Sequence, residues 1–176
     1  MQTRKLIILL VIYAIIFTVL VTYTTLPEKL RTIERSLEIQ RTVDVEKIKL
    51  FDVMADVKHY PSILPDNYVS VEILSNTTNS IMSLETIKEA GVQTTFKVQH
   101  TIIPFQSHQI TILDGDAKGT SIMILFNSLD DNKTQISATL DLKVKGIMYP
   151  FGILPEQNIR HAFNTILDHF VSYLQN

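Results

Sequence analysis

The segment that decides the fold is EQNIRHAFNTILDHFVSYL, residues 156–174, near the end of a 176-residue chain. Its apolar side chains recur at helical spacing and are Ile159, Ala162, Phe163, Ile166, Leu167, Phe170, Val171 and Leu174. This spacing predicts an amphipathic helix with one continuous apolar face. Such a face has to be covered, so the helix must pack against a large apolar surface elsewhere in the chain.

That surface is predicted to be a β-sheet. Residues 134–144 alternate apolar and polar side chains without interruption, which is typical of a half-buried strand. Six further strand-like runs, separated by turn residues, are residues 33–43, 68–74, 81–87, 92–103, 106–113 and 121–127. Because most connections are short, we expect an α+β fold with a seven-stranded antiparallel sheet under the C-terminal helix.

The N-terminal region predicts a membrane anchor. Residues 6–26 carry no charge, and 21 residues of helix reach about 31 Å, close to the hydrocarbon thickness of a bilayer. A cleaved signal peptide is the alternative, although its apolar part is usually shorter. Four basic residues follow the run and two precede it, which favours a cytoplasmic domain on a single-pass protein. The predicted parts are therefore an anchor (1–26), a linker (27–32) and one domain (33–176).

Composition excludes several function classes. Outside the first five residues the chain has 14 basic and 18 acidic side chains, a net charge of −4, which argues against nucleic acid as a partner. The absence of cysteine excludes thiol nucleophiles, disulfides and Cys-ligated metal sites. Neither a Gly-x-Gly-x-x-Gly nor a Walker loop occurs, so we predict no cofactor and no metal.

One segment resembles a known family. Residues 51–65, FDVMADVKHYPSILP, are similar to the helix-to-helix stretch of the START-like superfamily (SRPBCC; polyketide cyclase/dehydrase and lipid-transport proteins), with its Ala-Asp, Tyr-Pro and closing Pro. The most similar branch is the coenzyme Q-binding START-like group. The resemblance covers residues 33–176 and implies a helix-grip fold, in which a curved sheet wraps around the last helix and leaves a deep apolar cavity. The chain departs from the pattern at Leu64, where many relatives carry an aromatic residue.

Two histidines are the main candidates for polar chemistry in such a cavity. A turn centred on Pro104 and Phe105 would place His100 nearly opposite His108, both on the apolar side of the sheet. Two imidazoles there are suited to gripping a carbonyl or hydroxyl group, or to acid–base catalysis. The alternatives are that a bulge turns either ring outward or that both are structural. A third metal ligand on that face is missing.

The predicted ligand-binding residues combine these histidines with the apolar wall and one unusual loop. Residues 146–155, GIMYPFGILP, are too apolar for an ordinary connection, so we expect them to cap the cavity mouth, the alternative being that they pack under the helix end. The full set is Phe96, Val98, His100, His108, Ile110, Ile112, Leu140, Met148, Tyr149, Phe151, Phe163 and Leu167.

Three functions remain open from the sequence. The favoured one is membrane-tethered binding or transfer of a hydrophobic small molecule, such as a quinone, isoprenoid or lipid. The second is a cyclase or dehydratase acting on a hydrophobic or polyketide-like substrate, with His100 and His108 as acid and base. The third is a structural or assembly role with a filled core.

Overall fold

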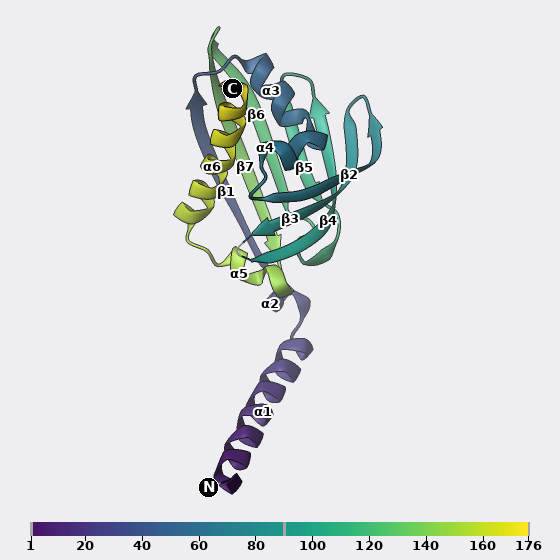
Figure 1. Ribbon diagram of the computed structural model, residues 1–176, viewed down its shortest axis with the longest axis vertical. Coiled ribbons are helices and arrows are strands. Elements are labelled where there is room, and N and C mark those ends of the chain that lie inside the picture. Colours follow the sequence, from purple (N-terminus) through teal and green to yellow (C-terminus); the bar gives the residue numbers. More distant parts are fainter. Residues whose placement is uncertain (1, 90, 176) are drawn as a thin grey trace.

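The computed structural model describes residues 2–89 and 91–175 (Figure 1). Met1, Ala90 and Asn176, which belong to the predicted anchor and domain, lie outside the described residues. A helix at the N-terminus, α1 (Gln2–Thr25), projects from an α+β domain, and a short helix, α2 (Glu28–Arg31), leads from it into the sheet.

The sheet has seven antiparallel strands, as predicted, in the order β1-β7-β6-β5-β4-β3-β2. The strands are β1 (Ile33–Val43), β2 (Tyr68–Thr77), β3 (Ser80–Glu89), β4 (Val92–Ile103), β5 (Ser107–Ile112), β6 (Ser121–Asp130) and β7 (Lys133–Val144). Strands β2 to β7 follow one another as neighbours, because each connection is short. The first strand pairs with the last, Ile33 opposite Val144 and Val43 opposite Thr134.

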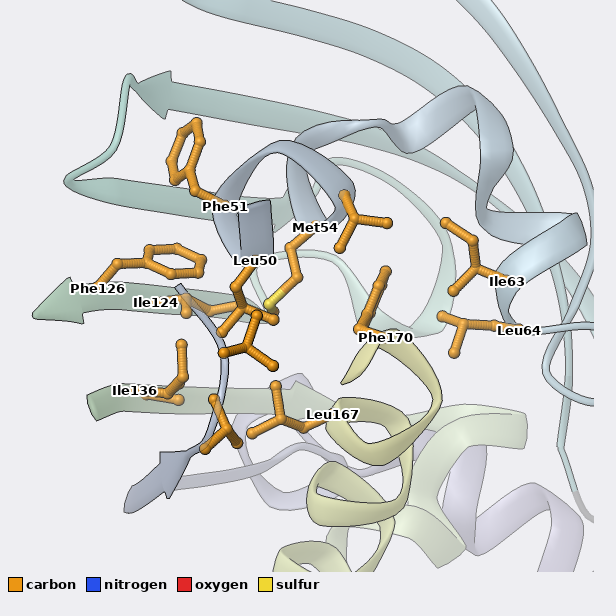
Figure 2. Close-up of a cluster of buried hydrophobic side chains, with 14 of the residues drawn as sticks. Leu50, Phe51, Met54, Ile63, Leu64, Ile124, Phe126, Ile136, Leu167 and Phe170 are labelled. Carbon is orange, nitrogen blue, oxygen red and sulfur yellow. The ribbon is translucent and has the colours of Figure 1, made fainter. Parts of the chain in front are cut away.

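Helices cover one face of this curved sheet (Figure 1). They are α3 (Lys47–Ala55), η1 (Val57–His59), α4 (Tyr60–Ile63) and the long C-terminal α6 (Glu156–Gln175). Short turns η2 (Gly115–Ala117), η3 (Gly146–Met148) and α5 (Tyr149–Gly152) complete the connections. Figure 2 shows the resulting core, in which Leu50 and Met54 of α3 meet Ile124 and Ile136 of the sheet and Leu167 of α6.

The predicted membrane span is contradicted. A span requires about 20 consecutive, predominantly apolar residues. In the part of the chain that the structure describes, no helix is both long and apolar enough to cross a membrane. The prediction of a single-pass membrane protein was therefore wrong, and the predicted cytoplasmic placement of the domain, which depended on that span, is withdrawn with it.

Arginine side chains hold the C-terminal region against β1. Arg35 donates to the carbonyl oxygens of Gly152 (3.2 Å) and Leu154 (2.7 Å), just before α6 begins. Arg41 donates to the Asn164 carbonyl (2.9 Å) and forms an ion pair with Asp168 on α6. In return, Arg160 of α6 donates to a backbone carbonyl of β1. These contacts attach one long side of α6 to the edge strand.

Gly152 occupies a position that leaves no room for a side chain. A Cβ atom there would lie 2.6 Å from Cγ2 of Val144 and 3.0 Å from Cβ of Ile33. We expect Gly152→Ala to lower the free energy of unfolding by about 1–3 kcal/mol, as overpacking in a close-packed site does. Urea unfolding checks this. Adding Val144→Ala, which removes Cγ2, should recover part of the loss, and a neutral Gly152→Ala would contradict the packing argument.

Candidate functional site

A chain of buried polar side chains crosses three neighbouring strands. Nε2 of His100 (β4) lies 2.6 Å from Oε1 of Glu85 (β3), and Nδ1 of His100 lies 2.9 Å from Nε2 of His108 (β5). Ser83 donates its hydroxyl to the same Glu85 oxygen over 2.6 Å. All four residues are at most 2% exposed. Polar side chains in the interior are stable only when they are hydrogen-bonded to one another. These four residues, called the polar chain below, therefore form a defined hydrogen-bond network in the core.

Strand register explains how these residues meet. Successive side chains of a strand point to opposite faces, so Ser83 and Glu85 share a face of β3. His100 lies opposite Ile81 in that ladder. On the other side His100 pairs with Ile110, while His108 pairs with Ile102. The two histidines are therefore diagonal neighbours, within reach of each other.

The centre of the turn between β4 and β5 lies half a residue later than predicted. The loop between β4 and β5 holds three residues, Pro104 to Gln106, with Ile103 paired to Ser107. Phe105, at its centre, has φ 60, and the Gln106 amide donates to the Ile103 carbonyl. A loop centred on Phe105, rather than between Pro104 and Phe105, makes residue 110 instead of residue 109 the direct partner of His100.

Burial keeps the His108 side chain uncharged. Loss of solvation, followed by the positive charge of His100, lowers the pKa of His108 from 6.5 to about 3, while the Met54 carbonyl acts in the opposite direction. His108 is thus neutral at pH 7. Its Nδ1 atom has no hydrogen-bond partner among the described residues.

The hydrogen-bond network assigns the protons. A neutral His108 carries one proton, and the nearby Met54 carbonyl, an acceptor, favours Nδ1 as its position. Nε2 of His108 then accepts from Nδ1–H of His100. Nε2 of His100 faces Oε1 of Glu85 at 2.6 Å. The hydrogen bonds thus run in one line from His108 through His100 to Glu85.

An apolar cavity of about 90 Å³ lies between the sheet and α6. Its lining residues are Met54, Tyr60, Leu64, Tyr68, Ile110, Ile122, Ile124, Phe163, Ile166, Leu167 and Phe170. Several of them surround the end of α6 in Figure 2, among them Met54, Leu64, Leu167 and Phe170. The cavity thus occupies the centre of the helix–sheet interface.

Two tyrosines connect the polar chain with this cavity. Tyr68 hydrogen-bonds Glu85, and Tyr60 donates its hydroxyl to the Met54 carbonyl over 2.7 Å. The Tyr60 ring stands edge-on to Tyr68, His100 and Phe170, with ring centroids 5.1, 6.3 and 5.6 Å away. Burial, followed by the nearby Glu85 charge, raises the pKa of both phenols well above 10, so both stay protonated.

A comparison with known protein families identifies the family of this protein. Residues 43–171 match the family described as polyketide cyclase / dehydrase and lipid transport. The chain belongs to this family. No curated protein sequence matches it.

Several solved structures have the same fold as this protein. The Zhui aromatase/cyclase from Streptomyces sp. R1128 has a TM-score of 0.61 and 19% identity over 81% of this chain and 94% of that one. A START superfamily protein from Mycobacterium smegmatis scores 0.60 with 14% identity, over 79% and 93%. Norcoclaurine synthase from Thalictrum flavum also scores 0.60 with 14% identity, over 84% and 90%. At these identities the likeness concerns the fold alone.

The predicted ligand-binding residues do not all lie in one place. Ile110, Phe163 and Leu167 line the central cavity. His100 and His108 lie behind it in the polar chain, and Leu140 lies in the main core. Phe96 and Val98 belong to a second buried cluster, against which Ile112 and Met148 pack.

The apolar loop lies away from the cavity lining. Phe151 instead lines a separate open groove with Leu154 and residues of α6. Tyr149 begins α5, beside Met148. The segment is held in place, because Asp116 accepts the Ile147 amide over 2.9 Å and Arg35 binds the Gly152 and Leu154 carbonyls.

Sequence reasoning missed Glu85, Ser83, Tyr60 and Tyr68. In β3 both alternating sets contain polar and apolar residues, so parity alone does not say that Glu85 points inward. A Ser-x-Glu pair on the same face as Ile81 and Ile87 was the available signal. Among the described residues no group of three potential ligands could hold a metal ion.

Proposed function

We propose that the chain binds an apolar small molecule, of the quinone, isoprenoid or lipid type, in the cavity between the sheet and α6. The observation that carries this is the cavity itself, an apolar space at the centre of the helix–sheet interface with a polar chain behind two tyrosines of its wall. Ligand sites generally combine an apolar lining with a few placed polar groups. The family description, which includes lipid transport, supports the proposal. So does the resemblance of residues 51–65 to the coenzyme Q-binding branch.

Ligand entry requires α6 to move. Ligand pockets usually measure about 300–1,000 Å³, whereas this cavity measures about 90 Å³. Arg35, Arg41 and Arg160 attach the helix region to β1, but its cavity side contacts the wall through apolar residues such as Phe163 and Phe170. Apolar contacts are non-directional, so we infer that α6 tilts on its β1 side and the cavity widens toward Tyr60 and Tyr68.

A substitution that fills the cavity tests this function. Ile122 lines the cavity from β6, and Ile122→Phe should occupy part of it. We expect the affinity for an apolar fluorescent probe such as 1-anilinonaphthalene to fall about tenfold or more, equivalent to about 1.4 kcal/mol. Titration of probe fluorescence measures the affinity.

The matched control is Leu125→Phe, on the same strand but 45% exposed and outside the cavity lining. It should bind the probe as the wild type does. Native mass spectrometry of gently purified protein shows in addition whether a cellular ligand is retained. Equal affinities for wild type and Ile122→Phe would place binding elsewhere and contradict the proposal.

A second candidate function is acid–base catalysis on a hydrophobic substrate, as in a cyclase or dehydratase. The observation that favours it is the 2.6 Å hydrogen bond between Glu85 and His100 behind the cavity wall. The resemblance in fold to an aromatase/cyclase supports it equally. The test is elimination of water from an aryl β-hydroxy ketone, followed by absorbance of the enone. Turnover that Glu85→Gln abolishes would favour catalysis, whereas binding without turnover favours a carrier.

A further inference from the structure

The polar side chains of the cavity wall already donate their protons to other residues of the protein. Of the residues that line the cavity, only Tyr60 and Tyr68 carry a side-chain oxygen or nitrogen. A phenol has a single proton to donate. Tyr60 gives its proton to the Met54 carbonyl and Tyr68 gives its proton to Glu85. Toward the cavity, both hydroxyls therefore offer only lone pairs.

The acceptors that hold these protons are themselves fixed. Met54 belongs to α3, and its side chain packs in the core. Glu85 is held by Ser83 and His100 as well as by Tyr68. Reversing either tyrosine bond would take one donor away from a buried acceptor, and this loss offsets the gain of a new bond to the ligand.

We propose that this cavity selects apolar ligands that carry a hydrogen-bond donor, a phenol or alcohol group, over ethers, ketones and carboxylates. The inference rests on the proposed function and names its ligand class. A ligand hydroxyl donates to the lone pairs of Tyr68 or Tyr60, whereas a carbonyl or ether oxygen meets another acceptor and stays unpaired in an apolar space. By the same rule a quinol fits the site better than the corresponding quinone, whose two oxygens only accept.

Two probes of nearly equal apolar surface test the inference: 1-naphthol and its methyl ether, 1-methoxynaphthalene. We expect the full-length protein to bind the naphthol about fivefold more tightly, the value of one hydrogen bond of about 1 kcal/mol. Isothermal titration calorimetry, or displacement of a fluorescent probe, measures both affinities. Equal binding, or tighter binding of the ether, overturns the donor preference and leaves ligand binding intact. Absence of binding by both probes contradicts the proposed function as well.

Substitutions of the two cavity tyrosines test which of them accepts the hydrogen bond from the ligand hydroxyl. Tyr68→Phe should reduce the naphthol-to-ether ratio toward one by weakening naphthol binding, and Tyr60→Phe provides the same test if Tyr68→Phe does not fold. The matched control is Tyr173→Phe on α6, where the side chain is 50% exposed and outside the cavity lining. It should keep the wild-type ratio. If both cavity variants keep the fivefold ratio, the tyrosines do not accept from the ligand and the inference fails.

Discussion

Replacing His100 with Ala is expected to lower the free energy of unfolding by about 3–5 kcal/mol, because it removes the central member of a buried, hydrogen-bonded group of ionisable side chains. Glu85 would keep Ser83 and Tyr68 but lose its hydrogen bond to the His100 ring, and Nε2 of His108 would lose its partner. A loss of this size is a large part of the total stability of an ordinary domain, about 5–15 kcal/mol. Urea unfolding followed by circular dichroism measures it.

His161→Ala is the matched control, because His161 is an exposed histidine on α6. Surface substitutions of this kind usually change stability by less than about 0.5 kcal/mol. A double variant, Glu85→Leu with His100→Leu, should be more stable than His100→Ala, since apolar side chains of similar volume then replace the whole pair. A His100→Ala protein as stable as the His161→Ala protein would show that the pair contributes nothing to folding.

The pH dependence of stability should carry a signature of His108. Its pKa in the folded protein, about 3, lies below the ordinary value of 6.5, so the unfolded chain takes up a proton first as the pH falls. The stabilising contribution is complete above about pH 6.5 and is lost as the pH falls toward 3. Between pH 6 and pH 4 we expect this residue to remove about 1.4 kcal/mol of stability per pH unit.

His108→Gln isolates this contribution, because Gln does not titrate while the acidic groups of the protein stay the same. Free energies of unfolding measured at several pH values should fall less steeply for His108→Gln than for the wild type, whatever the offset between the two at pH 7. Parallel curves would mean that His108 titrates near its ordinary pKa in the folded protein. In that case the polar chain would be open to solvent.

Local patterns account for the parts of the fold that were predicted. The apolar stripe of residues 156–174 corresponds to α6, and the alternation over residues 134–144 corresponds to β7. Both signals depend only on the spacing of side chains along a regular backbone, so they are legible before any partner is known. Short turns between successive strands likewise made the antiparallel arrangement predictable.

The candidate site was only partly predictable. His100 and His108 stood out as the polar members of apolar strand faces, and the structure does bring them together. Glu85 comes from β3, 15 residues before His100, and its orientation depends on a strand parity that the sequence leaves ambiguous. The partner of His100 also depended on the three-residue loop at Phe105, where a shift of the centre by half a residue moves the partner by one residue.

The sequence by itself determined which segments are helices and strands, that the sheet is antiparallel, and that a long amphipathic helix must cover it, because periodicity and turn chemistry are local properties. Only the tertiary structure decided which polar groups meet inside. The register of three strands brings Glu85, His100 and His108 into one hydrogen-bonded network. The size of the cavity, about 90 Å³, depends on how closely α6 approaches the sheet, a distance set by the packing of residues far apart in the chain.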